Sequence, residues 1–338
     1  MQQDTAASIR IATFNVENLD LPIETRLGVL QPALERLEAD VLCLQEVNAQ
    51  RVAGEKRREF LALDAVLSGT RYEGYHRSAT HPPGRDGPAD VHNLVTLSRF
   101  PITATRQVVH DLVPPVAAEL VTPRPKPEAP TPVRYERPGL VTEIDLGGQP
   151  LVVVNVHLRA PIASALPGQK LNASQWRTIG GWAEGYYLSG IKRIGQALEL
   201  RLLAEELFDR TPEPLILIAG DFNAEAGEIP LRLLVGAPED TGNAALAARS
   251  LVLLDRAVDA SRRFSVVHHG RPQMLDHMLA SHALYGFFRG IEVHNEALGD
   301  EAIGYAKRIE AAGSYHAAVV ATFKRTSASS APEPAPGT

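Results

Sequence analysis

The sequence has 338 residues, of which 44% are hydrophobic and 22% are charged, as in an ordinary globular protein. This composition excludes a disordered or collagen-like chain. The sequence has no apolar run of about twenty residues, which excludes a transmembrane helix. The 34 Lys and Arg residues against 40 Asp and Glu residues give a formal net charge of −6, which excludes binding to nucleic acid by overall charge alone. The single cysteine, Cys43, excludes an intramolecular disulfide and a cysteine-rich zinc site, and it suits a reducing compartment.

The chain begins with polar residues and then enters a series of apolar runs. Residues 1–8 contain no apolar stretch of the kind that a secretory signal needs, so we expect a flexible N-terminus and a cytoplasmic location. The runs at 9–14, 41–45 and 93–98 have the composition of buried strands. The apolar spacing within residues 26–39 predicts a helix between the first two of these strands.

A glycine pair separates two strand-like runs in the middle of the chain. Residues 140–146 and 150–158 flank Gly147 and Gly148, which predicts a hairpin. The second run is the more continuously apolar, and we expect it to be a central strand.

A helix and two more strands complete the predicted elements. One stripe of aliphatic residues predicts a helix that ends near Phe208 and is followed by strands at 215–220 and 317–324. The stripe consists of Ile191, Ile194, Leu198 and Leu202. Strands that alternate with helices predict an α/β layer architecture.

Three segments interrupt this pattern. Residues 113–139 are dense in proline, and we expect an excursion or edge loop without sheet or helix. Residues 161–190 hold both tryptophans of the chain, and two interpretations stay open: a lid over the segment near His157, or a surface segment anchored by aromatic residues. The small, polar and proline-rich tail 325–338 is expected to be disordered.

Polar residues recur where the apolar runs end. They are Asn15 and Glu17, Glu46, His157, Asp221 and Asn223, Asp276, and His316. A single Asn or Glu after a strand is usually a turn former or a solvated residue. Because binding groups converge at strand ends in sheet proteins, the ordered repetition predicts one shared pocket.

In this order the motifs resemble the endonuclease/exonuclease/phosphatase superfamily, the group that contains DNase I and the exonuclease III type of abasic-site endonucleases. The motifs are TFNVEN, LQEV, NLVTLSRFPI, NVHL, GDFNA, MLDH and SYH. The stretch around MLDH is more similar to bacterial nuclease-type members than to the inositol polyphosphate 5-phosphatases, whose WCDR signature is absent. The resemblance implies one domain over residues 9–324 with the DNase I-like fold, a four-layer α/β sandwich with two central mixed β-sheets.

Phosphodiester hydrolysis has two requirements. A water molecule must give up a proton, and positive charge must lie near the non-bridging oxygens of the phosphate. Oxygen ligands for Mg²⁺ or Mn²⁺ meet the second need, and the resemblance implies Glu46 and Asn15 for this role. His316, with its other nitrogen held by Asp276, is the expected general base. These assignments predict a divalent-metal-dependent phosphodiester hydrolase, endonuclease-like by preference.

The resemblance implies further residues around the phosphate. His157 and Asn223 are expected to donate hydrogen bonds to its oxygens, and His157 is also a candidate general acid. Asp221 is expected either to orient the nucleophilic water or to assist the leaving group, and the sequence leaves this choice open. Asn93 is a candidate substrate-binding residue. His277, beside Asp276 in an extended segment, is expected to point to the opposite side and to be structural.

One position departs from the family pattern. The usual residue before the last histidine is an Asp that contributes to the metal site, whereas this chain has Tyr315. A phenol is neutral at working pH and is a poorer ligand for a hard cation. We expect weaker metal binding with turnover retained, and a degenerate, non-catalytic member remains the alternative.

Three hypotheses for the substrate follow. Nucleic acid is favoured by the GDFNA and MLDH neighbourhoods and by possible basic patches at residues 56–58 and 262–263, which are equally ordinary solvated faces. A small or lipid head-group phosphoester is mildly favoured by the net negative charge. A binding protein on an inactivated fold is supported by Tyr315. We expect a monomer without a membrane span.

Overall fold

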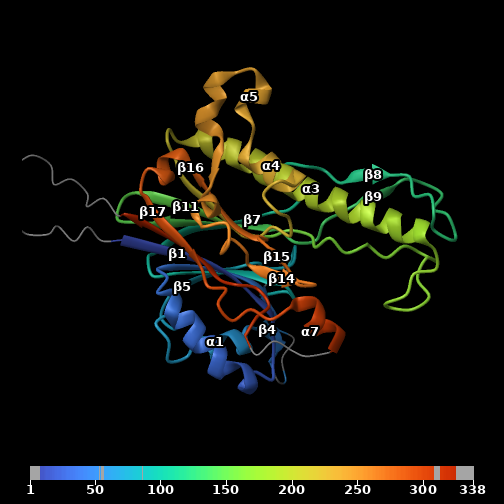
Figure 1. The fold of residues 1–338 in the computed structure, drawn as a ribbon, viewed down its shortest axis with the longest axis horizontal. Coiled ribbons are helices and arrows are strands. Elements are labelled where there is room, and N and C mark those ends of the chain that lie inside the picture. The colour runs from blue at the N-terminus through green and yellow to red at the C-terminus, as the bar shows by residue number, and fades with distance from the viewer. Residues whose placement is uncertain (1–7, 53, 55–56, 86, 308–312, 325–338) are drawn as a thin grey trace, which may run out of the picture.

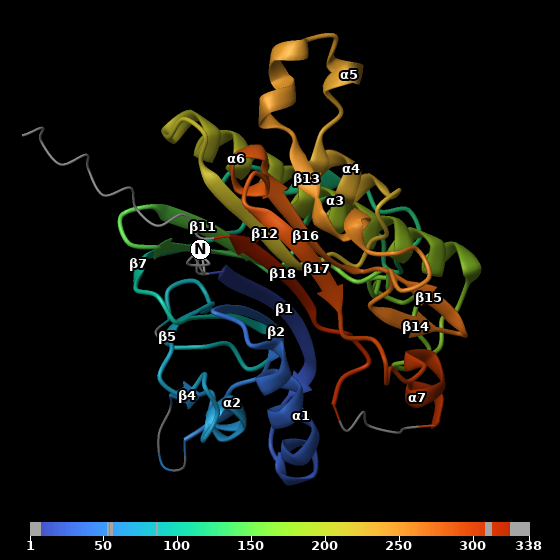
Figure 2. The same ribbon diagram turned by 60° about the vertical axis from the view of Figure 1, so that its left-hand side comes forward.

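The computed structural model describes residues 8–52, 54, 57–85, 87–307 and 313–324. Two six-stranded sheets lie against each other, and helices cover their outer faces (Figures 1 and 2). This arrangement confirms the predicted four-layer α/β sandwich with two mixed sheets. Lys56, the tail at 325–338 and all but the last residue of the predicted flexible start lie outside the described residues.

The first sheet has the strand order β17-β18-β1-β2-β6-β5, in which β1 and β2 are parallel and the other neighbours are antiparallel. Its strands are β1 (Ser8–Leu19), β2 (Val41–Val47), β5 (His76–Ala79), β6 (Asn93–Ser98), β17 (Phe288–Val293) and β18 (Val319–Lys324). The four predicted strands at 9–14, 41–45, 93–98 and 317–324 all belong to this sheet.

The second sheet has the order β13-β16-β12-β11-β10-β7, in which β11 and β12 are parallel and the other neighbours are antiparallel. Its strands are β7 (Ile102–Val108), β10 (Gly139–Asp145), β11 (Pro150–His157), β12 (Leu215–Asp221), β13 (Leu251–Leu253) and β16 (Asp276–Ser281). The predicted hairpin is the antiparallel pair β10 and β11, and β11 is central as expected.

Helices α1 (Glu24–Leu37) and α2 (Leu61–Leu67) cover the first sheet, while α3 (Ile179–Arg210) and α4 (Ile229–Val235) cover the second (Figure 2). The remaining short helices are α5 (Pro238–Thr241), α6 (His282–Tyr285), α7 (Glu301–Lys307), η1 (Ala244–Arg249) and η2 (Leu254–Ala257). Across the described ranges, no helix is both long enough and apolar enough to cross a membrane.

Apolar side chains fill the three spaces between the four layers. Leu42 and Leu44 of β2 face α1 and α2, whereas Val41 and Cys43, alternating with them, face the second sheet. This is the period-two pattern of a strand that is buried on both faces. Burial raises the pKa of the Cys43 thiol to about 12, so it is an inert core atom.

The expectation that residues 113–139 contain no sheet is wrong. Within them β8 (Val116–Ala118) pairs with β9 (Thr131–Val133), a two-stranded ribbon in which Pro132 can sit because a strand at a sheet edge need not donate every backbone hydrogen bond. The remaining strands also form two-stranded ribbons: β3 (Gln50–Arg51) with β4 (Arg58–Glu59), and β14 (Val266–His268) with β15 (Arg271–Gln273).

The aromatic segment 161–190 packs against the proline-rich segment and ends inside α3. Arg124 donates its backbone N–H to Pro167 over 2.9 Å, and Glu184 accepts the backbone N–H groups of Val121 and Thr122. Trp182 and Tyr186 stack on each other, 44% and 43% exposed. These contacts favour a surface segment over a lid.

Candidate active site

Three strands of the second sheet bring their polar residues to one edge. In the registers of the ladders, His157 at the end of β11 lies opposite Asp221 of β12, and Asp221 lies opposite Asp276 at the start of β16. Because β16 is antiparallel to β12, its first residue meets the last residue of β12. The side chains of His157 and Asp221 are both 2% exposed and that of Asp276 is fully buried.

The first sheet contributes through the carboxyl ends of its parallel pair. Asn15 lies opposite Gln45 in the β1 and β2 register, which then shifts before Leu19. Glu46 follows with a left-handed φ of 59°, and its Oε2 accepts the backbone N–H of Asn18 over 3.0 Å. The irregular ladder thus turns Glu46 towards the second sheet.

One amide and one imidazole connect the two sheets. Asn15 Nδ2 donates to Glu46 Oε1 over 3.3 Å and to Asp221 Oδ2 over 3.1 Å. His157 Nε2 lies 3.7 Å from Glu46 Oε1 and 3.4 Å from Asp221 Oδ2. Residues that are far apart in the sequence therefore meet in one cluster, as the strand-end pattern predicts.

His316 enters this cluster from the segment before β18. Its Nδ1 lies 2.8 Å from Asp276 Oδ2, and its Nε2 lies 4.0 Å from Asp221 Oδ2. Ser314, which accepts the backbone N–H of His316, also donates to the backbone oxygen of Asn15. The first sheet thus supplies the imidazole and the second sheet the carboxylate that orients it.

Burial and crowding of carboxylates change the proton affinities in the cluster. Burial, with smaller effects from Asp276 and Glu46, raises the pKa of Asp221 to about 7, although His316 and the N–H of Asn223 act against it. For His316, burial alone would lower the pKa, but Asp276 and Asp221 together raise it to about 10. In the protein alone, His316 is therefore a cation at neutral pH.

Asn223 lies beside Asp221 with its donors engaged. Its backbone N–H donates to Asp221 Oδ1 over 2.8 Å, and its Nδ2 lies 3.1 Å both from Asp221 Oδ2 and from the carbonyl oxygen of Leu158. Its φ of 49° is left-handed, a conformation that Asn tolerates better than most residues. Asn223 thus belongs to the cluster, where it orients Asp221.

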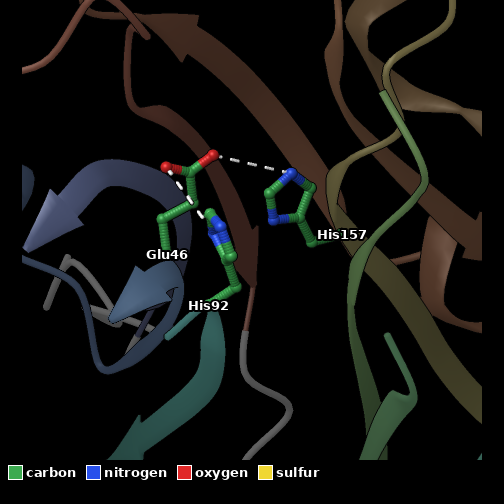
Figure 3. A group of neighbouring side chains, drawn as sticks. All are labelled: Glu46, His92 and His157. Carbon is green, nitrogen blue, oxygen red and sulfur yellow. Dashed lines mark ion pairs between the residues drawn. The ribbon is translucent and has the colours of Figure 1, made fainter. Parts of the chain in front are cut away.

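Two imidazoles flank the Glu46 carboxylate (Figure 3). His157 Nε2 faces Oε1, and His92 Nδ1 lies 4.0 Å from Oε2. His92 precedes β6 and was not predicted, because no motif contains it. Among the described residues, the buried Nδ1 of His92 neither accepts nor donates a hydrogen bond.

The donor chemistry around Glu46 fits a divalent cation. Glu46, His92 and His157 each bring one candidate ligand atom within 4.8 Å of the others, and Asp221, Asp276 and His316 form a second such group. The carboxylate oxygens in both groups suit Mg²⁺ or Mn²⁺. Glu46 keeps 15% of its side chain exposed and can take up an ion from water. Asn15 presents its N–H group to the carboxylates and its oxygen to the Glu17 backbone, so its amide must turn before the oxygen can join Glu46 as a ligand.

Arg137 is a second residue that sequence reasoning missed. Its Nη1 lies 2.5 Å from His157 Nε2 and donates to the Leu158 carbonyl oxygen over 3.1 Å. Because a guanidinium only donates, Nε2 is the acceptor nitrogen of His157. This contact argues against His157 as general acid through Nε2. No sequence signal marked Arg137, since it lies in the proline-rich segment.

Asn93 and His277 make contacts of a structural kind. The Asn93 amide is 1% exposed, donates to the carbonyl oxygens of Val47 and Ala89, and accepts the Ala89 N–H, so the structure does not offer it to a substrate. His277 is fully buried, with Nδ1 3.1 Å from Asp255 Oδ2. Its side chain points away from Asp276, as expected for neighbours in a strand.

Tyr315 turns its ring away from the carboxylate cluster. The ring packs against α7, where a Cβ at Gly304 would clash with the Tyr315 hydroxyl, and its backbone N–H donates to the Glu17 carboxylate over 2.9 Å. The side chain is therefore a packing residue and does not replace an aspartate ligand.

Three of the four arginines described in the suggested basic patches form ion pairs. Arg57 pairs with Glu59 and Arg58 with Asp90. Arg262 pairs with Glu296, and Arg263 donates to backbone carbonyl oxygens. Since three of these charges are paired with carboxylates, they favour ordinary solvated faces over a nucleic-acid surface.

Comparisons with known proteins identify the family and the fold. The model of the Endonuclease/Exonuclease/phosphatase family matches residues 12–316. No curated protein matches the sequence. Similar solved structures include truncated TDP2 from Caenorhabditis elegans, which is 14% identical with a TM-score of 0.56 over 94% of this chain and 98% of that one.

Two further structures are similar at the same level of identity. An endonuclease/exonuclease/phosphatase family protein from Leptotrichia buccalis is 14% identical, with a TM-score of 0.51 over 94% of this chain and 100% of that one. The human Nocturnin catalytic domain with bound sulfate is 14% identical, with a TM-score of 0.50 over 94% of each chain. At this identity the likeness concerns the fold.

Proposed function

The chain belongs to the endonuclease/exonuclease/phosphatase family, and from this premise we propose that this metal-dependent phosphoester hydrolase cleaves nucleic-acid phosphodiesters with a water activated by His316 and Asp276. The observation that carries the proposal is the 2.8 Å contact between His316 Nδ1 and Asp276 Oδ2, within the cluster that contains Glu46. This contact leaves Nε2 of His316 free of Asp276 and directed towards Asp221.

The protein side chains divide the work of hydrolysis. His316 takes the proton of the attacking water at Nε2, while Asp276 fixes the ring and stabilises the imidazolium that forms. Asp221, 4.0 Å from that nitrogen, orients the water, and Asn223 orients Asp221. His157 donates its Nδ1–H to a phosphate oxygen.

Glu46 and Asn15 would hold the divalent cation. When bound, the cation supplies positive charge to the non-bridging oxygens and favours the neutral form of His316 by repulsion. The ion is Mg²⁺ or Mn²⁺, because the donors are carboxylate and amide oxygens.

A small phosphoester is the second candidate substrate. The ion pairs of Arg57, Arg58 and Arg262 and the net charge of −6 favour it, since long nucleic acids gain much affinity from cationic side chains that contact phosphates. The retained Glu46 and the contact between His316 and Asp276 favour a hydrolase over the inactivated-fold hypothesis, which Tyr315 supports.

A substrate panel separates these candidates. Purified protein with Mg²⁺ or Mn²⁺ is incubated with supercoiled plasmid, single-stranded RNA, bis-p-nitrophenyl phosphate and p-nitrophenyl phosphate, beside EDTA and His316→Ala controls. Plasmid nicking that falls steeply with salt supports the nuclease. Hydrolysis of small esters with intact plasmid supports the second candidate.

A further inference from the structure

Arg137 is held in place from two sides. Its Nη1 contacts His157 Nε2 at 2.5 Å and the Leu158 carbonyl oxygen at 3.1 Å, both at the end of β11. The backbone carbonyl oxygen of Arg137 accepts a hydrogen bond from Nε2 of Gln196 in α3 over 2.9 Å. Nearby, the Tyr135 hydroxyl donates to Glu199 of α3 over 2.8 Å. The guanidinium is therefore built into the cluster and is not a mobile surface group.

The contact with Arg137 fixes the tautomer of His157. Nε2 must accept from the guanidinium, so the ring proton lies on Nδ1. In the described chain, the buried Nδ1 of His157 has no hydrogen-bond partner. Protonation of Nε2 would set two positive donors against each other at 2.5 Å.

The charge of Arg137 also acts on the carboxylates. Its Nη1 contacts His157 Nε2, and that nitrogen lies 3.7 Å from Glu46 Oε1 and 3.4 Å from Asp221 Oδ2, so the guanidinium charge lies close to both carboxylates. An arginine keeps its charge at every working pH. A fixed positive charge at this place repels a second cation and attracts an anion.

We propose that Arg137 is a positioning residue that holds His157 as the Nδ1–H tautomer, and that its fixed charge weakens the binding of a divalent cation at Glu46 while strengthening the binding of a phosphate group. The inference rests on the proposed function, because the phosphate group is that of its substrate. It adds a residue that no motif of the sequence contains.

Metal and phosphate binding test the charge of Arg137. Mn²⁺ affinity is measured by electron paramagnetic resonance, and inorganic phosphate affinity by calorimetry at saturating Mn²⁺, in the parent, Arg137→Met and Arg137→Lys. Arg137→Met should bind Mn²⁺ about tenfold more tightly and phosphate about tenfold more weakly, whereas Arg137→Lys keeps the charge and should stay within about twofold of the parent for Mn²⁺.

Arg124→Met is the matched control. It removes one charge from the same proline-rich segment, where the Arg124 guanidinium donates to nearby backbone carbonyl oxygens, and it should leave both affinities unchanged. Opposite changes in metal and phosphate affinity are a result that general loss of packing does not produce. Equal Mn²⁺ affinity in the parent and in a folded Arg137→Met would overturn the inference.

Nitrogen chemical shifts test the tautomer in the parent, so the inference remains testable even where Arg137→Met does not fold. With ¹⁵N-labelled histidine, His157 should carry its proton on Nδ1, and a proton on Nε2 would contradict us. Neither readout needs turnover. An inactive parent with the expected affinities refutes the proposed function alone, and an active parent with unchanged affinities refutes the inference alone.

Discussion

The two sheets contribute differently to the cluster. The first sheet supplies Glu46 from an irregular strand end with a left-handed backbone, and this side chain is 15% exposed. The second sheet supplies His157, Asp221 and Asp276 in regular register, with their side chains at most 2% exposed. His316 connects the two by placing an imidazole from the first sheet on a carboxylate of the second.

This difference in exposure suits the two sheets to two different tasks. An exposed carboxylate exchanges ligands with water, whereas a buried group has its proton affinity set by burial and neighbouring charge. The first sheet therefore suits the binding of an ion and the second suits proton transfer. Substitutions on each side should fail in different ways.

The largest effect is expected where the two sides meet. His316→Ala removes the proposed base, and kcat/KM for bis-p-nitrophenyl phosphate should fall about 1,000-fold, since general-base catalysis contributes about 10²–10⁴-fold. His76→Ala, on the exposed part of β5, serves as the control and should keep parent activity. A loss below about tenfold would show that His316 is not the base.

Two single substitutions, one in each half of the site, distinguish the roles of the two sheets. Glu46→Gln removes the charged ligand, and Mn²⁺ affinity measured by electron paramagnetic resonance should fall about 100-fold or more. Asp276→Asn leaves Glu46 intact, so Mn²⁺ affinity should change by less than about threefold while turnover is lost. Equal losses of Mn²⁺ affinity in both variants would mean that the tasks are not divided.

Tyr315 tests whether the family's missing aspartate matters on the first-sheet side. Tyr315→Asp leaves a cavity against α7 and should lower the free energy of unfolding by about 3–5 kcal/mol in urea titrations, without tighter Mn²⁺ binding. Tyr187→Asp, at a residue 63% exposed, is the matched control and should change stability by less than about 0.5 kcal/mol. If Tyr315→Asp kept the stability of the parent and bound Mn²⁺ more tightly, position 315 would be a metal-ligand site and the prediction would be wrong.

The smallest effect concerns a buried pair behind the second sheet. Burial lowers the pKa of His277, but Asp255, the backbone of Ala224 and Asp276 together outweigh burial, and the pKa is raised above 6.5. The charged pair therefore stabilises the fold fully below the ordinary histidine pKa, and this stability is lost as the pH rises through the raised value. The unfolding free energy of the parent relative to His277→Gln should shrink with increasing pH. A difference that grows with pH would contradict the pairing.

Hydrophobic patterning predicted the sheets better than the segments between them. The strands β1, β2, β6, β11 and β12 are continuous apolar runs, so the sequence alone marks them. The first three turns of α3 were missed because Gly180, Gly181 and Gly185 are poor helix formers. Tertiary contacts explain why two of these positions are glycine. A side chain at Gly181 would clash with Gln169, and a side chain at Gly185 would clash with the carbonyl oxygen of Ser164.

The candidate cluster was predictable only where motifs carry it. Seven residues at strand ends, found from their motifs, do meet: Asn15, Glu46, His157, Asp221, Asn223, Asp276 and His316. His92 and Arg137 were missed because they come from loops, whose paths depend on long-range packing. Asn93 was assigned to substrate because its sequence position does not reveal that backbone groups occupy its amide.

Turnover of a generic phosphodiester tests the two-sheet site most directly. The rate of bis-p-nitrophenyl phosphate hydrolysis is measured against Mn²⁺ concentration in the parent, Glu46→Gln and His316→Ala. We expect saturable Mn²⁺ activation in the parent, activation shifted to higher Mn²⁺ in Glu46→Gln, and no recovery at any Mn²⁺ concentration in His316→Ala. Turnover in His316→Ala equal to that of the parent, or a folded parent that binds Mn²⁺ without hydrolysing the ester, would contradict the site.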